Sequence, residues 1–289
     1  MVRLILAAGF AALPGMLQAQ PSAQYVPGSE GIKGASLPPP RFYLRDYNYF
    51  YWAGQLNDPT GHKGGPPNFQ ALTYANIPRA IWITDVKFLG GYVGVDGLLP
   101  LVDQHVKAGE FDSTTFGIGD LFGEGTLSWH IKQFDFSLGS GVWAPTGDSA
   151  PPPTTRVGAG YWTFMQTAGA TWYVDEAKTW AVSALNRFEF NTEQRDTHVT
   201  PGDAWTLEWG VSKSVCKEAD LGVVGYYQRQ VTANSDKLSS LNSVAAIGPE
   251  VSFMFPKQMI FVSLRYNYEF MAKNRAQGNA ATLTLTKAF

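Results

Sequence analysis

Cysteine is almost absent from this chain: Cys216 is the only one among 289 residues. A single cysteine cannot form an internal disulfide, so the small secreted folds that disulfides hold together are excluded. The four histidines are scattered without the spacing of metal ligands, and the sequence contains no phosphate-binding loop or dinucleotide fingerprint. The sequence therefore predicts no metal site and no cofactor.

Charge is also scarce. Charged residues make up 16 % of the chain, against about a quarter in an average soluble domain. The 22 basic and 24 acidic residues give a net charge of −2, without the basic excess that nucleic-acid binding requires. We therefore expect no nucleic-acid partner.

Beyond the N-terminus, the chain has no apolar run long enough to form a membrane helix. Its mean hydropathy is −0.13, yet aromatic residues reach 14 %, with 9 Trp and 13 Tyr. Many aromatic residues, alternating polarity and the lack of a spanning helix are together typical of a transmembrane β-barrel.

The first 40 residues differ from the rest. Arg3, the apolar run after it and the small residue Ala19 predict a secretory signal peptide over residues 1–19, the alternative being a buried N-terminal helix. Residues 20–40 are rich in Pro, Gly and Ser and end in "SLPPP", which predicts an extended lead-in. We expect this lead-in either to fold into a barrel lumen as a plug or to remain a periplasmic tail. Residues 41–289 form the expected barrel.

From Arg41 onward, about twelve strand-like runs alternate with turns, an even number that suits a closed antiparallel barrel. Short connectors such as "KQ" and "PKQ" alternate with long ones such as "PTGDSAPPPTTRVGAG" and "TEQRDTHVTPGD". The stretches "KAGEFDSTTFGIG" and "MAKNRAQGN" are also predicted to be long loops. Outer-membrane barrels have short periplasmic turns and long external loops, so we expect both chain ends in the periplasm.

Polarity alternates within the runs. From Ile260 to Phe270 every second side chain is apolar or aromatic, whereas Ser263, Arg265 and Asn267 share the other face. In an outer-membrane barrel the apolar face contacts lipid and the polar face lines the lumen. The outer-membrane lipids are therefore an expected partner of this chain.

The chain ends in "LTLTKAF", a strand with one polar and one apolar face. We expect this strand to pair with the first one, because an open sheet edge in lipid leaves backbone groups without partners. The final Phe289 then lies at the membrane interface and resembles the C-terminal signal that the outer-membrane assembly machinery recognises. Lys287 departs from that signal, which usually has an apolar or aromatic residue at this place.

The polar face of the expected barrel supplies the candidate functional residues, because a pore acts through the side chains that line it. The residues assigned to the lumen are Asp46, Asn48, Asp120, Glu124, Asp135, Arg187, Glu189, Glu208, Glu250, Arg265, Asn267 and Glu269. Acidic groups outnumber basic ones in this set and could disfavour anions. Alternatively, the charges pair with one another across a narrow lumen.

Two functions other than solute passage stay open. Ser128 and His130 share a strand face, with Asp120 and Glu124 on the same strand, an arrangement that a membrane-embedded enzyme acting on lipid could use. Residues two apart on a strand are separated by about 7 Å, however, which is too far for a direct Ser–His hydrogen bond, so no catalytic residue is assigned. The other function is structure or surface recognition by a barrel with a blocked lumen.

Several ordered motifs resemble those of a known family. They are "YLRDYNYFYW", "GLLPLV", "GIGDL", "WAPTGD", "YWTF", "FEFNTE", "VGYYQRQVTANSD" and "IGPEVSF". In order and spacing they are similar to the outer-membrane proteins called the MetA-pathway of phenol degradation family. This resemblance implies a β-barrel in the bacterial outer membrane that transports aromatic or hydrophobic compounds. The leading hypothesis is therefore a monomeric barrel pore for a small, hydrophobic or aromatic solute.

Overall fold

The computed structural model describes residues 23–148, 155–237 and 240–289, and the expected signal peptide lies outside these ranges. Within them, no helix is both long and apolar enough to cross a membrane. The regular structure consists of β-strands: β1 (Arg41–Leu56), β2 (Gln70–Phe88), β3 (Gly91–Leu98), β4 (Leu101–Ala108), β5 (Phe111–Ile118), β6 (Leu121–Ile131), β7 (Phe134–Ala144), β8 (Thr163–Tyr173), β9 (Trp180–Asn191), β10 (Ala204–Cys216), β11 (Ala219–Gln230), β12 (Ser243–Phe255), β13 (Ile260–Lys273) and β14 (Ala276–Ala288).

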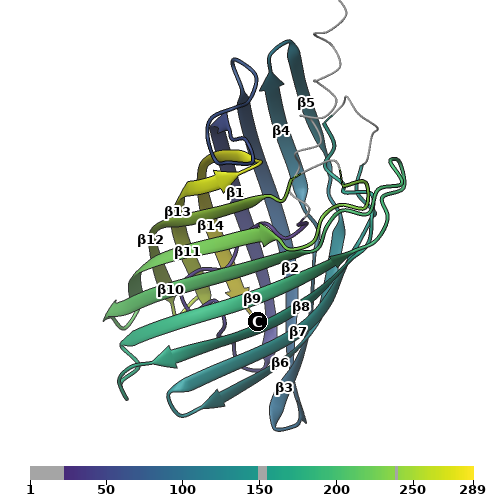
Figure 1. Ribbon diagram of the computed structural model, residues 1–289. Coiled ribbons are helices and arrows are strands. Elements are labelled where there is room, and N and C mark those ends of the chain that lie inside the picture. The colour runs from purple at the N-terminus through teal and green to yellow at the C-terminus, as the bar shows by residue number, and fades with distance from the viewer. Residues whose placement is uncertain (1–22, 149–154, 238–239) are drawn as a thin grey trace, which may run out of the picture.

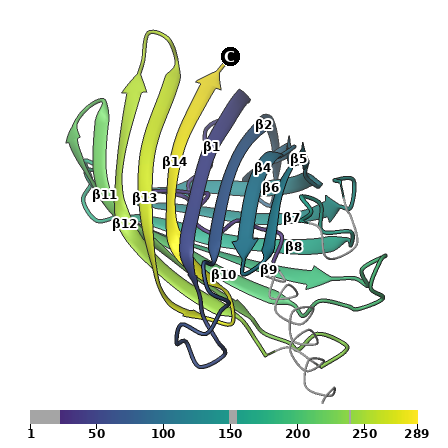
Figure 2. The same cartoon turned by 90° about the horizontal axis from the view of Figure 1, so that it is seen from above.

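The sheet closes on itself. β1 pairs antiparallel with β14 on one side and with β2 on the other, so the first and last strands meet at a hydrogen-bonded seam. The two views place β1, β2, β13 and β14 on one side of the barrel and β7 to β10 on the other (Figure 1, Figure 2). A β-sheet in lipid must close, because each backbone group left unpaired there costs several kcal/mol.

Two strands of the wall are interrupted. Leu99 and Pro100 separate β3 from β4, and Gly119 and Asp120 separate β5 from β6. Proline has no N–H to donate to a strand ladder, which accounts for the first break. β3 pairs with β6 and β4 with β5, so these four segments act as two long strands. The segments thus occupy twelve positions around the wall, and the prediction of a closed antiparallel barrel of twelve strands is confirmed.

The prediction of long loops at "KAGEFDSTTFGIG" and "MAKNRAQGN" is wrong. In the first, β4 and β5 continue as a hairpin that turns at Gly109, whose φ of 63° suits a tight turn. Figure 1 shows this hairpin projecting at one end of the barrel. In the second, only Asn274 and Arg275 separate β13 from β14. The same end of the barrel carries four long connectors, whose described residues are 57–69, 145–148 with 155–162, 192–203, and 231–237 with 240–242.

The two faces of the wall differ as a lipid-embedded barrel requires. In β14, Thr282, Thr284 and Thr286 are buried inside, whereas Leu283 and Leu285 are 37 % and 40 % exposed on the outside. Transmembrane barrels show this alternation because their outer face contacts acyl chains.

Before β1 begins, residues 23–40 run through the interior of the barrel, and we call them the luminal segment. The backbone N–H of Tyr25 donates to Glu189 Oε1 at 2.9 Å, and that of Ile32 donates to Glu250 Oε2, also at 2.9 Å. Inward-facing carboxylates thus satisfy backbone donors that have no strand partner.

Candidate functional site

The luminal segment places one carboxylate, Glu30, among arginines of the barrel wall. Its oxygens lie 3.1 Å from Arg45 of β1, 2.9 Å from Arg79 of β2 and 3.8 Å from Arg187 of β9. Buried charges are tolerated only when they are paired. The four side chains therefore tie the segment to both sides of the barrel.

Most of the residues that the sequence assigns to the lumen point inward. Those at most 6 % exposed inside the barrel are Asp120, Glu124, Asp135, Arg187, Glu189, Glu208, Glu250, Arg265, Asn267 and Glu269. Arg187 lies 3.0 Å from Glu208, and Arg265 lies 3.6 Å from Glu250. These charges compensate one another and bind the luminal segment, and they do not face an open water-filled pore.

The assignment of Asp46 and Asn48 to the lumen is wrong. In β1 the odd-numbered residues Arg45 and Tyr47 point inward to Glu30, so the even-numbered ones point outward. Asp46 lies opposite Leu285, which is exposed on the outer face. Asp46 and Asn48 thus lie on the lipid-facing side, contrary to the rule applied to the other strands.

A small hydrogen-bond network makes this outward position tolerable. The carboxylate of Asp46 accepts from Asn48 Nδ2 and from Asn76 Nδ2, each at 2.8 Å. Tyr74 donates its hydroxyl proton to Asn48 Oδ1 at 2.8 Å. Polar groups cost less free energy in an apolar environment when they are hydrogen-bonded to one another.

A spin label tests this orientation in a variant that lacks the exposed Cys216 (Cys216→Ser). A label at Asp46→Cys is expected to collide often with oxygen, which concentrates in lipid, and rarely with a water-soluble nickel complex. The inward-facing Thr284 provides the control, because a label at Thr284→Cys should collide less often with oxygen. Equal oxygen collision rates at the two positions would contradict the outward placement of Asp46.

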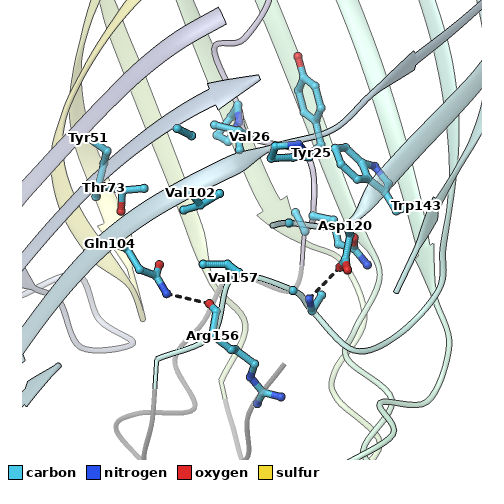
Figure 3. Close-up of a pocket in the computed structure, with 18 of the residues that line it drawn as sticks. Tyr25, Val26, Tyr51, Thr73, Val102, Gln104, Asp120, Trp143, Arg156 and Val157 are labelled. Carbon is cyan, nitrogen blue, oxygen red and sulfur yellow. Dashed lines mark hydrogen bonds between the residues drawn. The ribbon is translucent and has the colours of Figure 1, made fainter. Parts of the chain in front are cut away.

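A cavity of about 530 Å³ lies between the luminal segment and the long connectors (Figure 3). Tyr25, Val26 and Glu30 close it on one side, and residues 156–159 with parts of 194–201 line the other. Its volume falls within the roughly 300–1,000 Å³ that is usual for pockets that bind small molecules.

One wall of the cavity is aromatic. Phe122, Trp143 and Met165 pack with Tyr25 into a single buried cluster. The ring centroids of Phe122 and Trp143 lie 4.6 Å apart, with their planes tilted by 35°. Such a surface offers a flat apolar ligand both contact area and favourable ring–ring geometry.

The cavity offers no free charge among the described residues. Each charged side chain on its surface has a partner in the protein. The ion pairs are Arg79–Asp96 at 2.8 Å, Arg187–Glu208 at 3.0 Å, Arg156–Asp196 at 3.6 Å and Arg275–Glu269 at 3.9 Å. Glu30 pairs with three arginines. Asp120 accepts hydrogen bonds from two backbone N–H groups, and Asp236 also has a partner. A charged solute entering the cavity would lose its hydration without gaining a counter-charge, so the arrangement favours a neutral one.

Sequence reasoning missed most of this cavity. Of the residues assigned to the lumen, only Asp120, Arg187 and Glu269 line it. Three of its tyrosines, Tyr47, Tyr49 and Tyr51, come from the stretch "YNYFYW". Because β1 is aromatic on both faces, its periodicity could not show which face is inner. The spacing of the tyrosines at every second position was the signal available.

Ser128 and His130 do not form an enzyme-like pair. His130 Nδ1 lies 2.9 Å from Asp135 Oδ1. The buried hydroxyl of Ser128 has no hydrogen-bond partner among the described residues. A serine nucleophile needs a base within hydrogen-bond reach, and this geometry does not provide one.

Comparisons with known proteins extend these observations. The family model described as MetA-pathway of phenol degradation matches residues 53–285. A crystal structure of an outer-membrane channel from Pseudomonas putida F1 matches with a TM-score of 0.79 at 14 % identity, over 92 % of this chain and 100 % of that chain. The β domain of the Bordetella autotransporter Brka matches with a TM-score of 0.53 at 11 % identity, over 86 % of this chain and 99 % of that one. No curated protein sequence matches. At such identities, the structural matches show a shared barrel fold.

Proposed function

This chain belongs to the family described as MetA-pathway of phenol degradation, and on that premise we propose that it admits small, neutral, hydrophobic or aromatic solutes across the bacterial outer membrane. The match over residues 53–285 confirms the resemblance inferred from the motifs. The observation that carries the proposal is an aromatic-lined cavity inside a closed barrel, in which the described residues present no free charge. The similar fold of a protein described as an outer-membrane channel supports it.

In this proposal the luminal segment acts as a plug. Its backbone binds Glu189 and Glu250, and its Glu30 binds three arginines of the wall. A barrel filled in this way would hold back ions and polar molecules while a solute occupies the cavity beside the plug.

Filling the cavity tests the proposal. Val102 of β4 lines the cavity, so Val102→Trp is expected to lower the initial rate of toluene uptake severalfold, because the indole occupies the solute's space. The measurement uses radiolabelled toluene and cells that produce this barrel in place of their own. Val95 of β3 is 48 % exposed on the lipid-facing side, so Val95→Trp is the matched control. Equal uptake by the two variants would count against passage through the cavity.

The enzyme alternative receives less support. Ser128 has no hydrogen-bond partner among the described residues, and His130 is bound to Asp135. The similar fold of the Pseudomonas putida structure, which is described as an outer-membrane channel, is consistent with solute passage without chemistry.

A further inference from the structure

We propose that the outer face of the barrel carries a binding site for lipopolysaccharide, in which Arg229 and Lys273 bind the phosphate groups of lipid A. The site lies outside the cavity, so this inference goes beyond the proposed function and does not depend on it. It is carried by two cations at one end of the adjacent strands β11, β12 and β13 (Figure 2).

Strand pairing places the two cations at one level of the wall. Arg229 of β11 lies opposite Ser243 of β12, and Ser243 lies opposite Lys273 of β13. We call these three residues the rim row, because β11 ends one residue after Arg229 and β13 ends at Lys273. Val244 and Ala272, the chain neighbours of Ser243 and Lys273, are fully buried on the inner face, so the rim row points outward.

The rim row lies at the end of the barrel that carries the long connectors, since residues 231–237 and 240–242 follow β11 directly. In outer-membrane barrels this end is the external one. The outer leaflet of the bacterial outer membrane consists of lipopolysaccharide, whose lipid A carries phosphate groups above its acyl chains. The two cations therefore lie on the side of the membrane where these phosphates are.

Neither cation has an acidic partner. Arg229 and Lys273 are exposed, and neither forms a salt bridge within the part of the chain that the structure describes. The acidic residues of β9 to β14 all point inward, where they contact the luminal segment or other inner-face side chains. They are Glu189, Glu208, Asp220, Glu250 and Glu269. The positive charge of the rim row is thus available to an anion outside the barrel.

The loop between β1 and β2 adds a third cation beside the rim row. A Cβ atom built on Gly61 would lie 3.5 Å from Lys273 Cγ, so the loop packs against the stem of this lysine. Lys63 of the same loop is exposed. The only acidic residue of the loop, Asp58, accepts a hydrogen bond from the backbone N–H of His62 at 3.0 Å. Its carboxylate is therefore held within the loop.

The surface below the rim row is apolar. The next row toward the membrane centre consists of Tyr227, Ala245 and Phe270. The row after it contains Ile247 and Tyr268, which are 42 % and 51 % exposed. Aromatic side chains concentrate where the membrane meets water, so cations just beyond them lie at the level of the lipid headgroups. Cations above an apolar surface match a lipid that has phosphates above its acyl chains.

The spacing also suits a single lipid A molecule. Neighbouring strands lie about 5 Å apart, so the backbones at Arg229 and Lys273, two strands apart, are separated by roughly 10 Å. Both side chains are long and can reach phosphate oxygens from there. Arginine and lysine bind phosphate through charge-assisted hydrogen bonds, which are stronger than neutral ones.

Native mass spectrometry of the purified protein in detergent tests the proposal by titration with lipid A. We expect wild type to bind lipid A, and the double variant Arg229→Gln/Lys273→Gln to bind it about thirtyfold more weakly, roughly fivefold for each lost cation near a membrane surface. Lipid A from which the phosphate groups have been removed should bind wild type no more tightly than intact lipid A binds the double variant. Inorganic phosphate, compared with chloride at equal ionic strength, should not displace lipid A.

The matched control removes two positive charges at the opposite end of the barrel. Lys217 and Lys257 are exposed in the short turns after β10 and β12, so Lys217→Gln/Lys257→Gln should bind lipid A as wild type does. Heat-dependent mobility on SDS gels checks that each variant is folded. If the double variant of the rim row does not fold, Lys273→Gln alone should weaken binding about fivefold.

Several outcomes would overturn the site. They are equal binding of lipid A by wild type and the rim-row variant, an equal loss of binding in the control, and undiminished binding of lipid A without phosphates. Displacement by inorganic phosphate would indicate a site for the free ion and would also overturn it. Toluene uptake by the rim-row variant should equal that of wild type, so failure of this proposal leaves the proposed function standing.

Discussion

Replacing Arg79 with alanine is expected to lower the free energy of unfolding of the barrel by about 3–5 kcal/mol, the usual cost of breaking a buried ion pair. Arg79 lies 2.9 Å from Glu30, 2.8 Å from Asp96 and 3.6 Å from Glu124. Without its guanidinium, these carboxylates would face one another with less compensating charge. Chemical unfolding in detergent, followed by tryptophan fluorescence, measures the change.

Arg41 is the matched control for this prediction. It lies exposed at the start of β1, where its side chain contacts Met259 but makes no ion pair within the described ranges. Arg41→Ala should change the free energy of unfolding by no more than about 0.5 kcal/mol, as for most surface substitutions. If the Arg79 and Arg41 variants were equally stable, the charge network around Glu30 would not stabilise the barrel.

Deleting residues 23–36 is expected to raise the single-channel conductance severalfold. This part of the luminal segment carries Glu30 and the backbone donors that bind Glu189 and Glu250. Its removal would leave charged and polar side chains of the wall facing water along the axis of the barrel, and such a lining conducts ions. Planar-bilayer recordings on the purified protein measure the conductance.

A single substitution gives a milder form of the same experiment. Glu30→Gln keeps the size of the side chain but removes its charge, so we expect brief openings on a low background conductance. Glu176→Gln makes the same chemical change in the turn between β8 and β9, where Glu176 is exposed, and should leave the recordings unchanged. A deletion variant that conducts no better than wild type would show that the luminal segment does not block ion flow.

The strand pattern could be predicted because it is local. In β13, Leu264 is 55 % exposed and Arg265 is 2 % exposed, as the alternation of polar and apolar residues predicts. The same rule fails in β1. There Tyr47 is buried by its contacts with Glu30, and Asp46 is hydrogen-bonded on the outer face. Tyrosine suits either environment, because it combines an apolar ring with a polar hydroxyl group.

The cavity could not be predicted in this way, because its surface comes from segments that are distant in the sequence. Tyr25, Thr73 and Trp143 belong to the luminal segment, β2 and β7, and only closure of the barrel brings them together. The motif "GIGDL" did contain a useful signal. Its Asp120 accepts hydrogen bonds from the N–H groups of Gly147 and Ala159, and so holds part of a long connector beside the cavity.

The amino-acid pattern alone thus establishes a closed barrel of about twelve strands, because every strand must expose apolar groups to lipid and satisfy its backbone through neighbouring strands. Only the folded molecule decides which face of β1 is inner and where the luminal segment lies. It also decides which side chains line the cavity. These features depend on pairs such as Glu30 with Arg187 and Tyr51 with Glu269, whose members meet only when distant strands close around the axis.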